Sequence, residues 1–116
     1  MKDTIAYIKT EKRTFPIIFN LNVMEEIQEK YGSLDAWGKI TQGSGEPKIK
    51  DLKAGVIAMI NEGIDIENEK NGTNEPFVTD KQMGRIMTEV GMDGIIKAIQ
   101  DITVKSTKTE DTGKNE

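Results

Sequence analysis

The side chains in this chain that could carry out chemistry are almost all carboxylates. Its 116 residues include 20 Asp and Glu residues but neither histidine nor cysteine. A pair of carboxylates can move protons, yet a chain without His or Cys lacks the commonest general base, thiolate nucleophiles and zinc-thiolate ligands. Most of the acids also fall on predicted solvent-facing positions. We therefore predict that the protein is not an enzyme and has no catalytic residues.

One acidic segment imitates the opening of a calcium-binding loop. It reads Glu67-x-Glu69-x-Asn71-Gly72, with oxygen-bearing side chains at alternate positions. The twelfth position of such a loop should supply a bidentate glutamate, and here that position is Val78. We predict no metal site and no cofactor.

The charge pattern argues against binding to nucleic acids or membranes. The formal net charge is -4, which gives no general attraction to phosphate. Gly91 could join two helices of a helix-turn-helix, but the second helix would present Asp93, Lys97 and Asp101, two acids against one base. No apolar run approaches the roughly 18 residues of a membrane span, and the start resembles no signal peptide. We expect a cytosolic protein.

Aromatic and methionine side chains are the remaining candidates for a functional surface. Tyr31 and Trp37 flank the Gly32-Ser33 corner, where they could lock two helices together or serve as a partly exposed anchor for a partner. Met83 and Met87 lie on one helical stripe, which suits either a core or an adaptable protein interface. Both interpretations stay open for each pair.

The chain begins with two predicted short strands. Thr4–Lys9 partly alternates in polarity, Thr14–Phe19 is an apolar run, and the charged residues between them predict a β-hairpin. Pro16 has no N–H to donate, so its strand should lie at an edge of the sheet or turn the side without the N–H outward.

Two helices should follow the hairpin. Asn22 begins a pattern close to a capping box, and an apolar stripe then runs to Tyr31. Gly32 should end this helix in a left-handed conformation, and Ser33 can cap a short helix through Trp37.

The second half of the chain predicts three more elements and a tail. A central helix should run from about Ile49 to Gly63, and the polar segment 65–76 should form an exposed loop. Thr79 opens a capping box, and the helix it starts should end at Gly91, before a last amphipathic helix. Residues 104–116 contain no apolar side chain beyond Val104, which predicts a flexible, disordered C-terminal tail.

This order of segments resembles the tail assembly chaperones of siphophages and prophages of Gram-positive bacteria. The resemblance covers about residues 10–103. It rests on a basic turn, an apolar strand, Leu21-Asn22 opening a helix that ends in Lys30-Tyr31-Gly32-Ser33-Leu34, the central helix, an acidic loop, and a helix from Val78-Thr79 to Gly91.

The resemblance implies a non-enzymatic role in virion morphogenesis. Such chaperones bind the tape measure protein, keep it soluble in the bacterial host cytoplasm, and recruit tail tube protein around it. The family provides no catalytic residues to carry over. Tyr31, Gly32 and Leu34 match the family as a helix-ending corner. Our protein-interface candidates are Tyr31, Leu34, Trp37, Met83 and Met87.

We therefore expect an α+β, mainly α, single domain over residues 1–103, with an N-terminal β-hairpin followed by four to five short helices. Its predicted function is phage tail assembly, through binding of the tape measure protein. The alternative is a small regulatory adaptor that binds one host protein. The sequence leaves homo-oligomer formation open.

Overall fold

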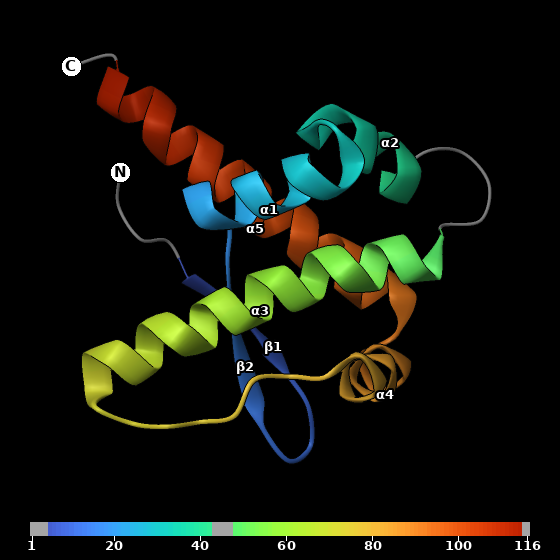
Figure 1. The fold of residues 1–116 in the computed structure, drawn as a ribbon, viewed down its shortest axis with the longest axis vertical. Coiled ribbons are helices and arrows are strands. Elements are labelled where there is room, and N and C mark those ends of the chain that lie inside the picture. The colour runs from blue at the N-terminus through green and yellow to red at the C-terminus, as the bar shows by residue number, and fades with distance from the viewer. Residues whose placement is uncertain (1–4, 43–47, 115–116) are drawn as a thin grey trace.

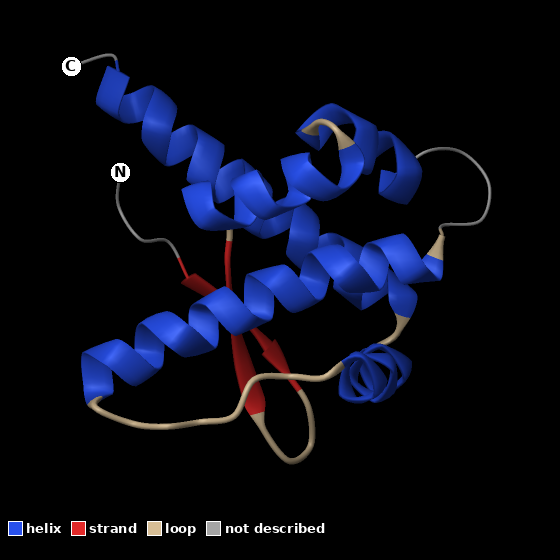
Figure 2. Ribbon diagram, in the orientation of Figure 1, coloured by secondary structure: helices blue, strands red, loops and turns tan. Residues whose placement is uncertain are grey.

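The structure, a computed structural model, describes residues 5–42 and 48–114 and places two strands before five helices (Figures 1 and 2). The elements are β1 (Ile5–Lys9), β2 (Thr14–Ile18), α1 (Leu21–Tyr31), α2 (Leu34–Gln42), α3 (Ile49–Asn71), α4 (Asp80–Val90) and α5 (Met92–Lys114). This confirms the expected mainly helical α+β fold with an N-terminal hairpin. The expected loop at residues 43–47 lies outside the described residues.

The hairpin pairs β1 with β2 in antiparallel register. Tyr7 lies opposite Pro16, and the turn closes where Thr10 N–H donates to the Arg13 carbonyl at 2.8 Å. Each strand of a two-stranded sheet is an edge strand, so Pro16 removes no hydrogen bond from a central strand. Residues 15–18 of β2 are all buried, which explains why this strand reads as an unbroken apolar run.

Helix α3 is the centre of the packing. It crosses the face of the hairpin in Figure 1 and contacts β2, α1, α2 and α4, while α5 contacts β1 and α4. Side chains from both strands and from α1 to α5 meet in one hydrophobic core. Its most deeply buried members are Ile17, Ile18, Val23, Leu52, Val56, Met59, Ile60, Ile64, Met83, Ile95 and Ile102.

Two predicted helix boundaries are confirmed by their backbone geometry. Gly32 has φ +90°, and its N–H donates to the Gln28 carbonyl at 2.7 Å, so α1 ends where a residue with a Cβ would be strained. Thr79 and Gln82 form the full capping box at the start of α4.

The predicted N-cap of α1 was wrong by two residues. The cap is Asn20, whose Oδ1 accepts from the Val23 N–H at 3.1 Å, whereas Asn22 lies inside the first turn. Its amide donates instead to Glu62 on α3 at 2.9 Å. Both asparagines suit a cap by residue type, and both amides donate to Glu62, so the contact with α3 does not distinguish them.

Helices α2, α3 and α5 run further than predicted. Helix α2 continues past Trp37 to Gln42, and α3 continues past Gly63 to Asn71. The exposed loop, predicted at residues 65–76, is therefore limited to residues 72–79. Gly63 does not stop α3, because it is a packing position rather than a terminus. The stop is Gly72, which adopts the left-handed conformation with φ +66°.

Helix α5 continues to Lys114, beyond the point where the tail was expected to begin. The side chains from residue 104 onward fall outside the description, and the flexibility of 104–116 stays a prediction. The two longest helices, α3 and α5, have 23 residues each. Within the described residues, no helix combines the length and apolarity needed to cross a bilayer.

Gly63 allows the backbones of α3 and β2 to approach each other. A Cβ built at Gly63 would lie 2.9 Å from the Pro16 carbonyl oxygen, closer than real Cβ atoms come to their neighbours. That oxygen belongs to the backbone and cannot rotate away. The contact therefore requires glycine at this position of α3.

We expect Gly63→Ala to destabilise the domain by roughly 1–3 kcal/mol, because the added methyl must push the hairpin away from α3. Gly38→Ala in α2 is the matched control, since its Cβ would meet no atom within 4 Å and alanine favours helix. Urea denaturation of both variants measures the difference. Equal midpoints would show that α3 and β2 can separate at little cost.

Candidate functional site

The Tyr31–Trp37 corner lies against the first turns of α3. The Trp37 ring is 4% exposed and packs against Gly55, and its Nε1 donates to the Asp51 carbonyl at 3.0 Å. The Tyr31 hydroxyl donates to Asp51 Oδ1, also at 3.0 Å. The two aromatic side chains therefore join α1 and α2 to α3, and Trp37 is no exposed anchor.

Leu34 and the methionine stripe also face inward. Leu34 is partly buried against the core, while Met83 and Met87 of α4 are 0% and 4% exposed. The spacing of the two methionines predicted an apolar face correctly, but that face packs against the core. The five interface candidates therefore form no shared exposed surface in this chain.

The described residues contain four large apolar side chains that are exposed. They are Tyr7, Leu21, Ile49 and Phe77. Phe77 follows Pro76 in the polar connection between α3 and α4, and 52% of its surface is exposed. Sequence reasoning missed it as a site residue. The available signal was an isolated aromatic residue outside any helical stripe.

Two asparagines on α3 fix the 72–79 segment that carries Phe77. Asn61 pairs with the backbone of Val78, accepting from its N–H at 2.7 Å and donating to its carbonyl at 3.2 Å. Asn68 pairs in the same way with the backbone of Glu75, at 2.9 and 3.0 Å. We call Asn61 and Asn68 the asparagine clamp. Because it holds the backbone on both sides of Phe77, this exposed ring has a defined position beside α3.

Phe77 forms one wall of an open groove on the outer surface of α3. In Figure 1, α1 lies above α3 and the 72–79 segment passes below it. The groove has a volume of about 240 Å³. We call it the acidic groove, and its lining residues are Glu26, Ile57, Ala58, Asn61, Glu62, Asp65 and Phe77.

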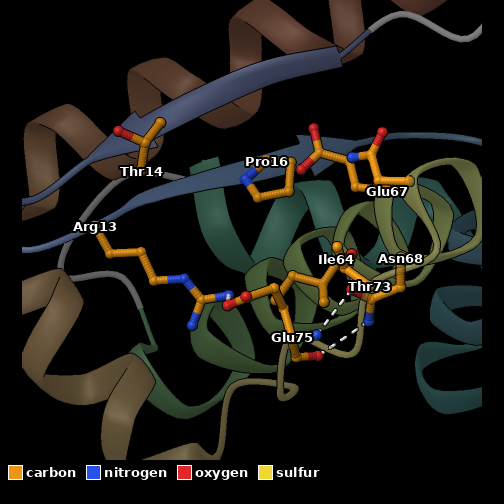
Figure 3. Close-up of a pocket in the computed structure, with 9 residues that line it drawn as sticks. Arg13, Thr14, Pro16, Ile64, Glu67, Asn68, Thr73 and Glu75 are labelled. Carbon is orange, nitrogen blue, oxygen red and sulfur yellow. Dashed lines mark hydrogen bonds and ion pairs between the residues drawn. The ribbon is translucent and has the colours of Figure 1, made fainter.

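A second hollow, also about 240 Å³, lies between the hairpin and the C-terminal end of α3 (Figure 3). Its polar side chains largely pair with one another. Arg13 approaches Glu75 at 3.6 Å, and Thr73 donates to Asn68 Oδ1 at 2.9 Å. These pairs attach the loop to the hairpin and to α3, and we assign this hollow a structural role.

Glu67, Glu69 and Asn71, which imitated the opening of a calcium loop, belong to the C-terminal end of α3. Glu67 accepts from the Tyr7 hydroxyl at 3.0 Å, which is the main cause of the raised pKa of Tyr7. Among the described residues, no three acidic side chains converge on a point where a metal ion could bind.

The Tyr31–Asp51 contact predicts how the stability of the domain changes at alkaline pH. Burial, then the hydrogen bond to the Asp51 carboxylate, raises the pKa of Tyr31 to about 12. The unfolded phenol ionises near pH 10, so the stabilisation is fully present below pH 10 and is lost as the pH rises towards 12. We expect Tyr31→Phe to lose less stability than the parent chain over that interval.

Absorbance titration of a Tyr7→Phe variant checks this directly, because Tyr31 is then the one tyrosine in the chain. The folded protein should ionise about 2 pH units later than the same chain in denaturant. Ionisation near pH 10 while circular dichroism still reports a folded chain would contradict the contact.

The asparagine clamp makes a prediction about stability. Asn61→Ala leaves the Val78 N–H and carbonyl without their partner, and we expect a loss of about 1–3 kcal/mol. Asn22→Ala, which removes an exposed hydrogen bond to Glu62, is the control and should cost under about 0.5 kcal/mol. Chemical denaturation measures both values. Similar losses for the two variants would mean that Asn61 does not fix the segment.

Comparison with known proteins gives no relative, since no family model, curated protein or solved structure matches this chain.

Proposed function

We propose that this protein is a non-enzymatic phage tail assembly chaperone that binds the tape measure protein and helps to recruit tail tube subunits. It would act in the cytoplasm of the bacterial host. The observation that carries the proposal is the order of elements over residues 10–103, from the basic turn of the hairpin to the helix pair around Gly91.

The segments that carry the resemblance pack together around one hydrophobic core. The helix that ends at Gly32 and the corner beyond it are joined to α3 through Asp51, and the helix that starts at Thr79 is connected to α3 by the clamped 72–79 segment. Because these segments share one core, each of them depends on the others for its position. That supports a domain whose task is to present a surface.

The exposed apolar side chains support protein binding. A tape measure protein is long and helical, and its apolar stripe would aggregate if it were made alone. A chaperone for such a helix needs an apolar surface with a polar margin rather than a reactive pocket. Phe77, set among acidic residues beside α3, provides a surface of this kind.

Co-expression tests the proposal. We expect the tape measure protein of the same phage to be mostly insoluble alone, and to become soluble and co-purify when this chain is produced with it. Several copies of the chain should accompany each tape measure protein. Trp37→Asp, which introduces a carboxylate at a buried position, serves as an unfolded control and should give no protection.

If the tape measure protein stays insoluble and forms no complex, and the tail tube subunit also fails to bind, the proposal is wrong. A single host protein bound at equal stoichiometry would instead favour a regulatory adaptor.

A further inference from the structure

The acidic groove combines an apolar floor with charges of one sign. Ile57 and Ala58 of α3 form the floor, and Phe77 forms one wall. Ile57 is partly buried and Ala58 is buried, so the exposed ring of Phe77 is the main apolar surface that a ligand would meet.

Every charged residue that lines the groove is acidic. Glu26 projects from α1, and Glu62 and Asp65 project from α3, while no lysine or arginine appears among the described lining residues. Glu62 accepts hydrogen bonds from Asn20 at 2.8 Å and Asn22 at 2.9 Å, which fix its carboxylate without neutralising it. Glu26 and Asp65 are exposed. A ligand with an apolar stripe and flanking positive charges would complement both features.

The shape of the groove favours a helix as the occupant. Its floor follows α3 from Ile57 to Asp65, about 12 Å or two helical turns at 1.5 Å per residue. The segments on either side are held in place, α1 by packing on α3 and the 72–79 segment by the asparagine clamp. A partner helix lying along α3 could place apolar residues three or four positions apart against Phe77 and Ile57.

We propose that the acidic groove is the docking site for an amphipathic helix whose apolar stripe is flanked by lysine or arginine. This deepens the proposed function and rests on it for the natural partner, a helical segment of the tape measure protein. Two turns of contact give weak binding at one site. A long helix with successive basic segments would then bind several copies of the chain, each at its own segment.

The test uses the purified full chain and two synthetic helical peptides with the same leucine stripe, one flanked by lysine and the other by glutamate. Binding is followed by NMR chemical-shift changes. We expect the lysine peptide to bind, with the largest shifts at Ile57, Asn61 and Phe77, and to bind more weakly as salt is added. The glutamate peptide should bind at least about 5-fold more weakly, since its charges face Glu26 and Asp65.

A charge swap separates the groove from general electrostatics. Glu26→Lys/Asp65→Lys should weaken the lysine peptide by about 5–20-fold and strengthen the glutamate peptide. Asp93→Lys/Asp101→Lys on α5 is the control, because it changes exposed residues and makes the same change in net charge. It should alter the two affinities by less than about 2-fold.

An apolar pair of variants tests the role of Phe77. Phe77→Ala should weaken the lysine peptide by about 5-fold or more, whereas Ile49→Ala, at an exposed residue of α3 outside the groove, should not. The proposal would be overturned if Phe77→Ala and Ile49→Ala lost equal affinity for the lysine peptide. It would also be overturned if the two peptides bound equally well, or if the chemical-shift changes mapped to another surface. A dimer that depends on Phe77 and excludes the peptide would overturn it too, since the groove would then hold a second copy of the chain.

The two proposals can fail separately. The parent chain and Glu26→Lys/Asp65→Lys could make the tape measure protein soluble equally well. That result would support the chaperone role and would contradict the docking of a helix in the acidic groove. If the lysine peptide binds in the groove but the tape measure protein stays insoluble, the groove is a docking site for basic helices. Its natural partner is then a different basic helix.

Discussion

The close approach of α3 to its neighbours is the constraint on which the rest of the structure depends. Gly63 brings the backbone of α3 against the Pro16 carbonyl of β2, and Gly55 makes room for the ring of Trp37. The two glycines lie eight residues apart on one helix, and each removes a Cβ where another element must pass. They cost helix propensity, and the hydrophobic contacts that they permit along α3 offset that cost.

Because α3 is fixed by these contacts, its polar side chains can hold the segments around it. The Asp51 carboxylate accepts from Tyr31 and the Asp51 backbone carbonyl accepts from Trp37. Glu62 accepts from Asn20 and Asn22, and the asparagine clamp pairs with the backbone of the 72–79 segment. Apart from the Asn68–Glu75 pair, each contact joins residues far apart in the chain. The partly buried polar groups are thus paired, and loops that would otherwise be mobile are attached to a helix.

Burial explains why a surface cannot be identified from an apolar stripe alone. Met83 and Met87 have the spacing of an interface and are buried, while Phe77 belongs to no stripe and is exposed. The exposed ring of Phe77 lies on the clamped 72–79 segment, so its exposure leaves the core closed.

The sequence by itself determined the hairpin, the helical character of the chain after it, and the boundaries at Gly32, Thr79 and Gly91, because local backbone chemistry sets each of them. The tertiary structure alone decided that α3 continues through Gly63, where it packs against β2. It also decided that Phe77 lies beside three carboxylates from two helices. These outcomes depend on contacts between residues distant in sequence, for which a local pattern carries no signal.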